Sequence, residues 1–221
     1  MRMRVALPFI AMIVTGCGGS QQSRFYVLTA DPVPASRTAS TSATRTVALG
    51  AVHLPAALDR PQMARRVGSD EISYAEYERW AGPLDEMVRR VLFIDLDGRL
   101  APGMTLIENR TASPASLTIS VDILRFDADD TGLVKLDARW EMLGRAGGLV
   151  GAPHNARIVE PGSGRDAAAI AATMSRAVAD LAGEIATSVS GTATALARNG
   201  FVIALHLPSR MTLAIPTVHL H

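Results

Sequence analysis

The chain has 221 residues, a formal net charge of +1 and a single lysine, Lys135. A chain of this length can bury one sizeable core, and its balanced charge leaves no basic surface of the kind that binds nucleic acid. Cys17 is the single cysteine, so no disulfide within the chain can contribute to stability. The composition predicts one globular domain that is stabilised by packing and does not bind nucleic acid.

The first residues have the layout of a signal peptide. Arg2 and Arg4 precede an apolar run over residues 5–14, which is interrupted only by Pro8. About ten apolar residues are too few for a helix that spans a hydrocarbon core of about 30 Å. We therefore predict a signal peptide over residues 1–16.

The four residues Val14-Thr15-Gly16-Cys17 resemble the lipobox of bacterial lipoproteins. This resemblance implies that Cys17 receives a diacylglycerol on its sulfur and, after cleavage, an N-acyl chain on its new amino terminus. A thiolate is the side chain best suited to form the thioether, and two or three acyl chains make a stable anchor. We expect an acylated tether over residues 17–23 and no other cofactor. Because Gly18 rather than aspartate follows, we expect the outer membrane, on its periplasmic face.

We expect one folded domain over residues 24–192. Its first strands are predicted at residues 24–28 and 46–54, separated by a flexible loop over residues 31–44 that is rich in proline, alanine, serine and threonine. A loop then leads to a predicted hairpin with strands at residues 63–67 and 71–74.

The second half of the domain has clearer periodicity. A helix is predicted from Pro83 to about Gly98, because apolar residues recur there at helical spacing. Alternation predicts a long antiparallel hairpin with strands at residues 117–123 and 134–142, followed by a weaker strand at 149–159. The strongest helical pattern covers residues 166–189. The fold class is therefore α/β, a sandwich of a mixed, largely antiparallel sheet with two main helices, and residues 193–221 are expected to be a poorly ordered extension.

Three short motifs follow the lipobox in a fixed order. They are Phe25-Tyr26-Val27-Leu28, then Val52-His53-Leu54-Pro55 with Leu58-Asp59-Arg60-Pro61-Gln62, then Trp80-Ala81 with Pro83-Leu84-Asp85-Glu86. In this order they resemble the ABC-type transport auxiliary lipoprotein family, over roughly residues 14–189. Two departures are Ala57, where the family often has an aromatic residue, and the chain beyond Asn199, which has no counterpart in the family.

The resemblance implies a fold similar to the N-terminal domain of the Tol-system propeller protein. It also implies a non-enzymatic, periplasm-facing lipoprotein at the outer membrane. Its partners would be an MCE-domain protein, which forms a lipid conduit, and the inner-membrane ABC or permease complex of that conduit. A homo-oligomer that matches the ring symmetry of the conduit is a further expectation.

The residues themselves do not indicate an enzyme or a metal site. No Gly-x-Ser-x-Gly elbow precedes a helix, and the five histidines are scattered. Asp127, Asp129 and Asp130 lack the glycine and distal glutamate of a calcium loop, so we interpret them as the polar tip of a hairpin. We therefore predict no catalytic residue and no metal ligand.

A partner-binding surface is predicted at Leu58, Asp59, Arg60, Pro61, Gln62 and Trp80. Two prolines restrict this loop, and a restricted loop that carries charges suits recognition. The alternative is that Asp59 caps a turn and pairs with Arg60, while Trp80 packs on the core. Two other functions also remain open, a periplasmic lipid-binding carrier and a structural lipoprotein of envelope assembly.

Overall fold

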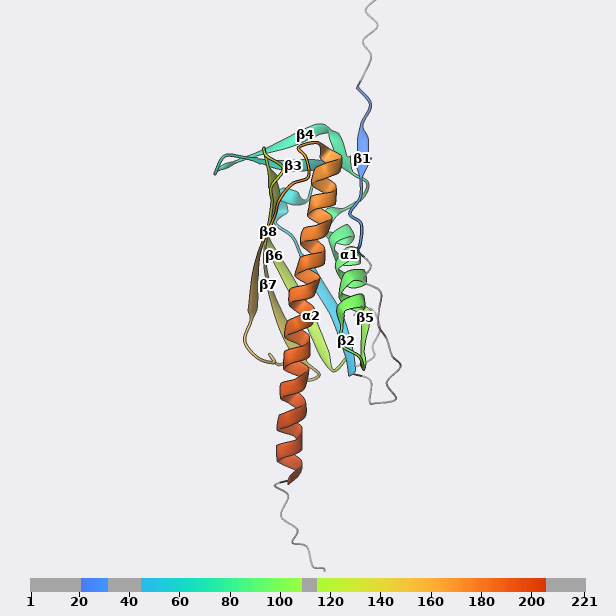
Figure 1. The fold of residues 1–221 in the computed structure, drawn as a ribbon, viewed down its shortest axis with the longest axis vertical. Coiled ribbons are helices and arrows are strands. Elements are labelled where there is room, and N and C mark those ends of the chain that lie inside the picture. The colour runs from blue at the N-terminus through green and yellow to red at the C-terminus, as the bar shows by residue number, and fades with distance from the viewer. Residues whose placement is uncertain (1–20, 32–44, 109–114, 206–221) are drawn as a thin grey trace, which may run out of the picture.

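The computed structural model describes residues 21–31, 45–108 and 115–205, with side chains described to residue 195. The predicted signal peptide, Cys17, residues 32–44 of the predicted loop and residues 206–221 lie outside this part of the chain. The described residues form one eight-stranded sheet, two long helices and a turn of 3-10 helix (Figure 1). The elements are β1 (Arg24–Tyr26), β2 (Arg45–His53), η1 (Ala56–Leu58), β3 (Gln62–Val67), β4 (Glu71–Trp80), α1 (Leu84–Arg99), β5 (Met104–Glu108), β6 (Leu117–Asp129), β7 (Val134–Gly144), β8 (His154–Glu160) and α2 (Ala167–Leu205).

The sheet is mixed, as predicted, and is built around the long strand β6. One edge of β6 pairs with β7 along nearly its whole length, and the opposite edge is shared by β2 and then β3. The strand order is β1-β4-β3-β6-β2-β5, with β7 and β8 continuing beyond β6. Four of the seven ladders are parallel, while the longest ladder, between β6 and β7, is antiparallel.

A bulge at Leu124 explains why β6 is longer than its alternation predicts. Up to Ile123 the apolar residues alternate and are buried, as expected. The register shifts between Ile123 and Arg125, so Leu124 is 63% exposed and Phe126 is buried. An extra residue reverses which positions face the core, so a search for strict alternation stops there. The strand in fact continues to Asp129.

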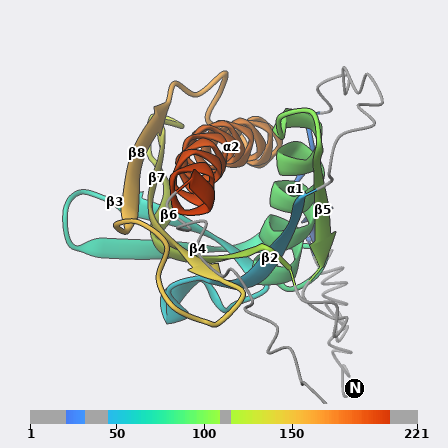
Figure 2. The ribbon, with the colours of Figure 1, turned by 90° about the horizontal axis from the view of Figure 1, so that it is seen from below.

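Both helices lie on the same, concave face of the curved sheet. Viewed nearly along α2, the sheet runs from β8 around to β5 with α2 and α1 inside the curve (Figure 2). Each helix buries the apolar stripe predicted from its spacing, at about 1.5–3 kcal/mol per large side chain removed from water. Buried members are Val88, Leu92 and Leu96 of α1 and Ile170, Met174, Val178, Leu181, Ile185 and Val189 of α2.

Two strands differ from the prediction. Residues 104–108, expected within a loop, form β5, a short strand that pairs in parallel with β2. β4 continues to Trp80, whereas the strand predicted there ended at residue 74. In both cases, hydrogen bonds to a distant strand decide the conformation, and the local sequence pattern does not predict these hydrogen bonds.

Helix α2 begins as predicted but ends much later. The Asp166 carboxylate accepts a hydrogen bond from the Ala169 N–H at 2.9 Å, which caps the first turn. No proline interrupts the sequence before Leu205, and α2 has 39 residues, or about 58 Å, so it extends beyond the sheet (Figure 1). Residues 193–205, which the sequence assigned to a poorly ordered extension, thus continue α2. No helix within the described residues is long and apolar enough to span a membrane.

The N-terminal segment closes the fold. β1 pairs in parallel with the last residues of β4. The Thr29 N–H then donates to the Ser175 hydroxyl of α2 at 3.0 Å, and the Asp31 N–H donates to the Asp95 carboxylate of α1 at 2.8 Å. The start of the domain is thus tied to both helices.

Candidate partner-binding site

The predicted recognition loop connects β2 to β3 and is well ordered by its own backbone. The N–H groups of Leu58 and Asp59 donate to the carbonyl oxygens of Pro55 and Ala56, which forms the single turn η1. The Arg60 N–H donates to the Leu58 carbonyl at 2.8 Å. These tight turns leave the loop little conformational freedom.

Tyr74 of β4 fixes the loop from outside. Its hydroxyl donates to the Ala57 carbonyl at 3.0 Å, and the Arg60 guanidinium lies 4.8 Å from the centroid of its ring, a cation–π contact. The Trp80 N–H also donates to the Pro61 carbonyl at 2.7 Å. Local pattern places Tyr74 in a predicted strand but does not indicate its contact with the loop, because one aromatic residue in a strand does not show what it packs against.

The structure divides the six predicted partner-binding residues into two groups. Asp59, Arg60 and Pro61 are exposed, and Gln62 is half-buried at the start of β3. Leu58 and Trp80 are only 7% and 4% exposed, and both belong to the core. Leu58 and Trp80 therefore anchor the loop and are not surface contacts, which agrees with the core alternative for Trp80.

The charges of the loop are not paired with each other. Arg60 stacks on Tyr74, and among the described residues neither the Asp59 carboxylate nor the Arg60 guanidinium forms an ion pair. The alternative in which Arg60 pairs with Asp59 is therefore wrong for this structure. Both charges stay available to a partner.

A polar hollow of about 310 Å³ lies between this loop and the start of α1. Its walls include the exposed side chains of His53, Asp59 and Asp85. Two carboxylates without an ion-pair partner in the described structure make the hollow suited to a basic side chain. Asp85 lies 26 residues after Asp59 in the sequence, so their position in one hollow is a result of the tertiary structure.

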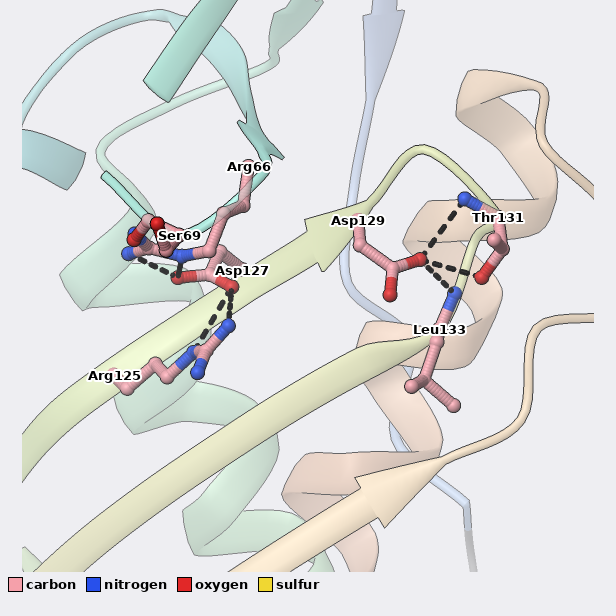
Figure 3. A network of polar contacts seen from close by, with 7 residues as sticks. All are labelled: Arg66, Ser69, Arg125, Asp127, Asp129, Thr131 and Leu133. Atoms are coloured by element: carbon pink, nitrogen blue, oxygen red, sulfur yellow. Dashed lines mark hydrogen bonds and ion pairs between the residues drawn. The ribbon is translucent and has the colours of Figure 1, made fainter. Parts of the chain in front are cut away.

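The acidic segment at the end of β6 is a structural feature. Asp127 is 3% exposed and lies within the strand, not at the hairpin tip, which corrects its predicted position. Its two oxygens accept four hydrogen bonds of 2.8–3.1 Å from the guanidinium groups of Arg66 and Arg125 (Figure 3). Because both oxygens are occupied by cationic donors, Asp127 cannot ligate a metal ion in this arrangement.

Asp129 holds the turn after β6. One of its oxygens accepts hydrogen bonds from the Thr131 N–H, the Thr131 hydroxyl and the Leu133 N–H (Figure 3). Burial raises the pKa of Asp129, but these hydrogen bonds outweigh it and hold the pKa below its usual value. Within the described residues, no group of three or more histidine, cysteine, aspartate or glutamate side chains is placed to hold a metal ion.

Comparisons with known proteins agree with this fold. The chain is similar to the crystal structures of an uncharacterised protein and of a protein from Xanthomonas campestris, each with a TM-score of 0.64. Sequence identity is 18% and 17%, and the matches cover 76% and 80% of this chain and 99% of each other chain. At this identity the likeness shows the fold alone. A comparison with curated protein sequences found no match.

A match to a protein-family model identifies the family, which the structural similarities do not. The model of the ABC-type transport auxiliary lipoprotein component matches residues 26–186, from the last residue of β1 to the middle of α2. This match covers the second and third motifs on which the resemblance rested, and all of the first motif except Phe25. The chain therefore belongs to the family of ABC-type transport auxiliary lipoprotein components.

Proposed function

We propose that this protein is a non-enzymatic lipoprotein, anchored by acylated Cys17 on the periplasmic face of the outer membrane, that docks an MCE-domain conduit protein. The conduit and its inner-membrane ABC or permease complex would move lipid between the two membranes. Family membership supports the auxiliary role in transport. The docking role depends on the surface formed by residues 55–62.

One observation carries this proposal, namely the rigidity of a loop that presents unpaired charges. Tyr74 and the buried side chain of Leu58 hold the loop in place, while Asp59 and Arg60 face solvent. A preordered loop loses little conformational entropy when it binds, and arginine is enriched among the residues that dominate binding energy. The hollow beside Asp59 and Asp85 would accept a basic side chain of the conduit protein.

The test is a pull-down of the acylated protein after crosslinking in the periplasm, with mass spectrometry of bound proteins and lipid. We expect wild-type protein to recover an MCE-domain protein, and Arg60→Glu to reduce recovery about tenfold, equivalent to about 1.4 kcal/mol of binding free energy. Arg145→Glu is the matched control, because Arg145 is exposed in the turn between β7 and β8.

Unchanged recovery by Arg60→Glu would place the docking surface elsewhere. Recovery of lipid without an MCE-domain protein by the wild type would instead favour the periplasmic carrier. Native mass spectrometry of the same sample tests the proposed homo-oligomer, because a ring that matches the conduit gives one defined mass.

A further inference from the structure

Exposed apolar side chains gather on the N-terminal segment. Phe25 is 66% exposed and Val27 is 56% exposed, and in an extended chain residues two apart point to the same side. Leu28 points the other way and is buried. Among the residues whose side chains the structure describes, the other large exposed apolar residues are far apart in the sequence: Val67, Ile94, Leu124, Leu149 and Val159. Single apolar residues are normal on a surface, whereas a local group indicates an interaction.

An open groove of about 570 Å³ lies beside this pair. Phe25 and Val27 form one wall, and the small side chains of Ala168, Ala171 and Ala172 on α2 form the other. The volume is within the range of sites that hold small apolar ligands, roughly 300–1,000 Å³. The groove therefore presents both a protruding apolar pair and room for an apolar chain.

Three charged or hydroxyl groups at the groove already have partners within the protein, and one of them, the exposed Asp31 carboxylate, lies 3.8 Å from the Arg99 guanidinium. The Ser175 hydroxyl accepts from the Thr29 N–H and donates to the Ala171 carbonyl. The Arg176 guanidinium donates to the Pro161 carbonyl and lies 3.5 Å from the Glu160 carboxylate. The groove thus offers apolar contact more than polar recognition, which suits hydrocarbon better than a peptide.

The short stretch of chain between Cys17 and Phe25 indicates what occupies the groove. Cys17 lies eight residues before Phe25. At 3.3–3.6 Å per residue, a fully extended chain would place an acylated Cys17 no more than about 29 Å from Phe25. β1 and the first turns of α2 lie near the same end of the molecule, where the described chain begins at residue 21 (Figure 1). The nearest large apolar phase is therefore the leaflet that holds the acyl chains of Cys17.

We infer that Phe25 and Val27 insert into this leaflet and that lipid acyl chains occupy the groove beside α2. This inference rests on the proposed lipid anchor and adds an orientation to it. The first turns of α2 face the membrane, and the helix carries its C-terminal end away from the leaflet. Acyl chains alone leave the domain free to tumble on its tether, whereas inserted side chains hold one face against the membrane.

The experiment measures the depth of a nitroxide label on the acylated full-length protein in vesicles of phosphatidylethanolamine and phosphatidylglycerol. Phe25→Cys and Val27→Cys each supply one labelling site, because the Cys17 sulfur is blocked as a thioether. Leu149→Cys is the matched control, since Leu149 is 57% exposed in the turn between β7 and β8, at the end of the sheet away from the start of α2. We expect the labels at positions 25 and 27 to collide more often with oxygen than with a water-soluble nickel complex. We expect the reverse at position 149.

Labels at positions 25 and 27 that match position 149 would overturn the inference, and so would labels shielded from both collision partners, because protein would then cover the groove. Flotation of the same vesicles separates this failure from failure of the anchor. Protein that floats with water-exposed labels contradicts the inserted groove alone. Protein that does not float contradicts the lipid anchor and the inserted groove together.

Discussion

Asp95 is a buried carboxyl group whose ionised form is destabilised by its surroundings. It is fully buried on α1, and one of its oxygens has no hydrogen-bond partner. The other oxygen accepts from the Asp31 N–H, and the Arg99 guanidinium lies 3.6 Å away. Burial raises the pKa of Asp95, and the Arg99 charge and the Asp31 N–H offset only part of this rise. Asp95 thus connects the N-terminal segment to α1 at an electrostatic cost.

This raised pKa predicts how stability depends on pH. The unfolded-state pKa of aspartate is about 3.9. Because the folded-state pKa is higher, protonated Asp95 contributes fully to the free energy of unfolding below about pH 4, and this contribution is lost as pH rises through the folded-state pKa. Asp95→Asn keeps an oxygen for the Asp31 N–H and removes the titration. We expect its free energy of unfolding, relative to wild type, to increase between pH 4 and pH 7 in urea titrations.

The matched variant for this titration is Asp85→Asn, at an exposed position of the same helix. It provides the baseline for removing one carboxylate from α1. A difference between wild type and Asp95→Asn that stays constant from pH 4 to pH 7 would contradict the raised pKa.

At the level of elements, the turn between β6 and β7 packs directly against the loop that precedes α2. Gly132 has a φ of +87°, and a Cβ atom there would lie 2.2 Å from the Gly164 carbonyl oxygen. A Cβ atom on Gly162 would lie 2.3 Å from the Gly132 carbonyl oxygen. These glycines let two backbone segments meet without a side chain between them.

Gly132→Ala should therefore destabilise the protein more than a glycine substitution in open space. Gly147 is the matched position, with a φ of +79° and nothing near its missing Cβ. We expect Gly147→Ala to cost about 1 kcal/mol, from the left-handed conformation alone. Gly132→Ala should cost clearly more, about 3 kcal/mol, because the contact with Gly164 must also open. Urea unfolding of both variants measures the difference, and equal losses would show that the contact yields without cost.

On the scale of the whole molecule, the N-terminal segment and the last helix close the fold together. Thr29 and Ser175 are 146 residues apart and share a hydrogen bond. Leu28 is 8% exposed within the core, whereas its neighbour Val27 is 56% exposed. The segment thus has one face that stabilises the domain and one face that is free for the membrane.

Substituting Leu28 and Val27 one at a time tests the buried face and the exposed face of the segment separately. We expect Leu28→Ala to lower the free energy of unfolding in solution by about 2–3 kcal/mol, because it leaves a cavity between the strand and the helices. Val27→Ala should change it by less than about 0.5 kcal/mol, as is usual for an exposed site. Urea unfolding without vesicles makes the measurement. A large loss for Val27→Ala would mean that Val27 contributes to folding and would weaken the case for a membrane-facing role.

The sequence by itself determined the elements whose signals are local. Helical spacing located both helices, strict alternation located the hairpin of β6 and β7 up to Ile123, and the ordered motifs identified the family. It also located the loop at Asp59 and Arg60 as a constrained segment, because proline acts on its own neighbours. Each of these signals depends on residues only a few positions apart.

Only the tertiary structure decided which of these residues are exposed and which are buried or paired. Asp127 meets Arg66 across 61 residues, Tyr74 stacks under Arg60, and Leu58 and Trp80 turn into the core. The short strand β5 and the last residues of β4 likewise form because distant strands supply their hydrogen bonds. Pairing across a sheet joins residues whose separation in the chain is arbitrary, so no local pattern encodes it. Burial depends on that pairing, and for this reason the sequence located the constrained loop along the chain but did not separate its exposed residues from its buried ones.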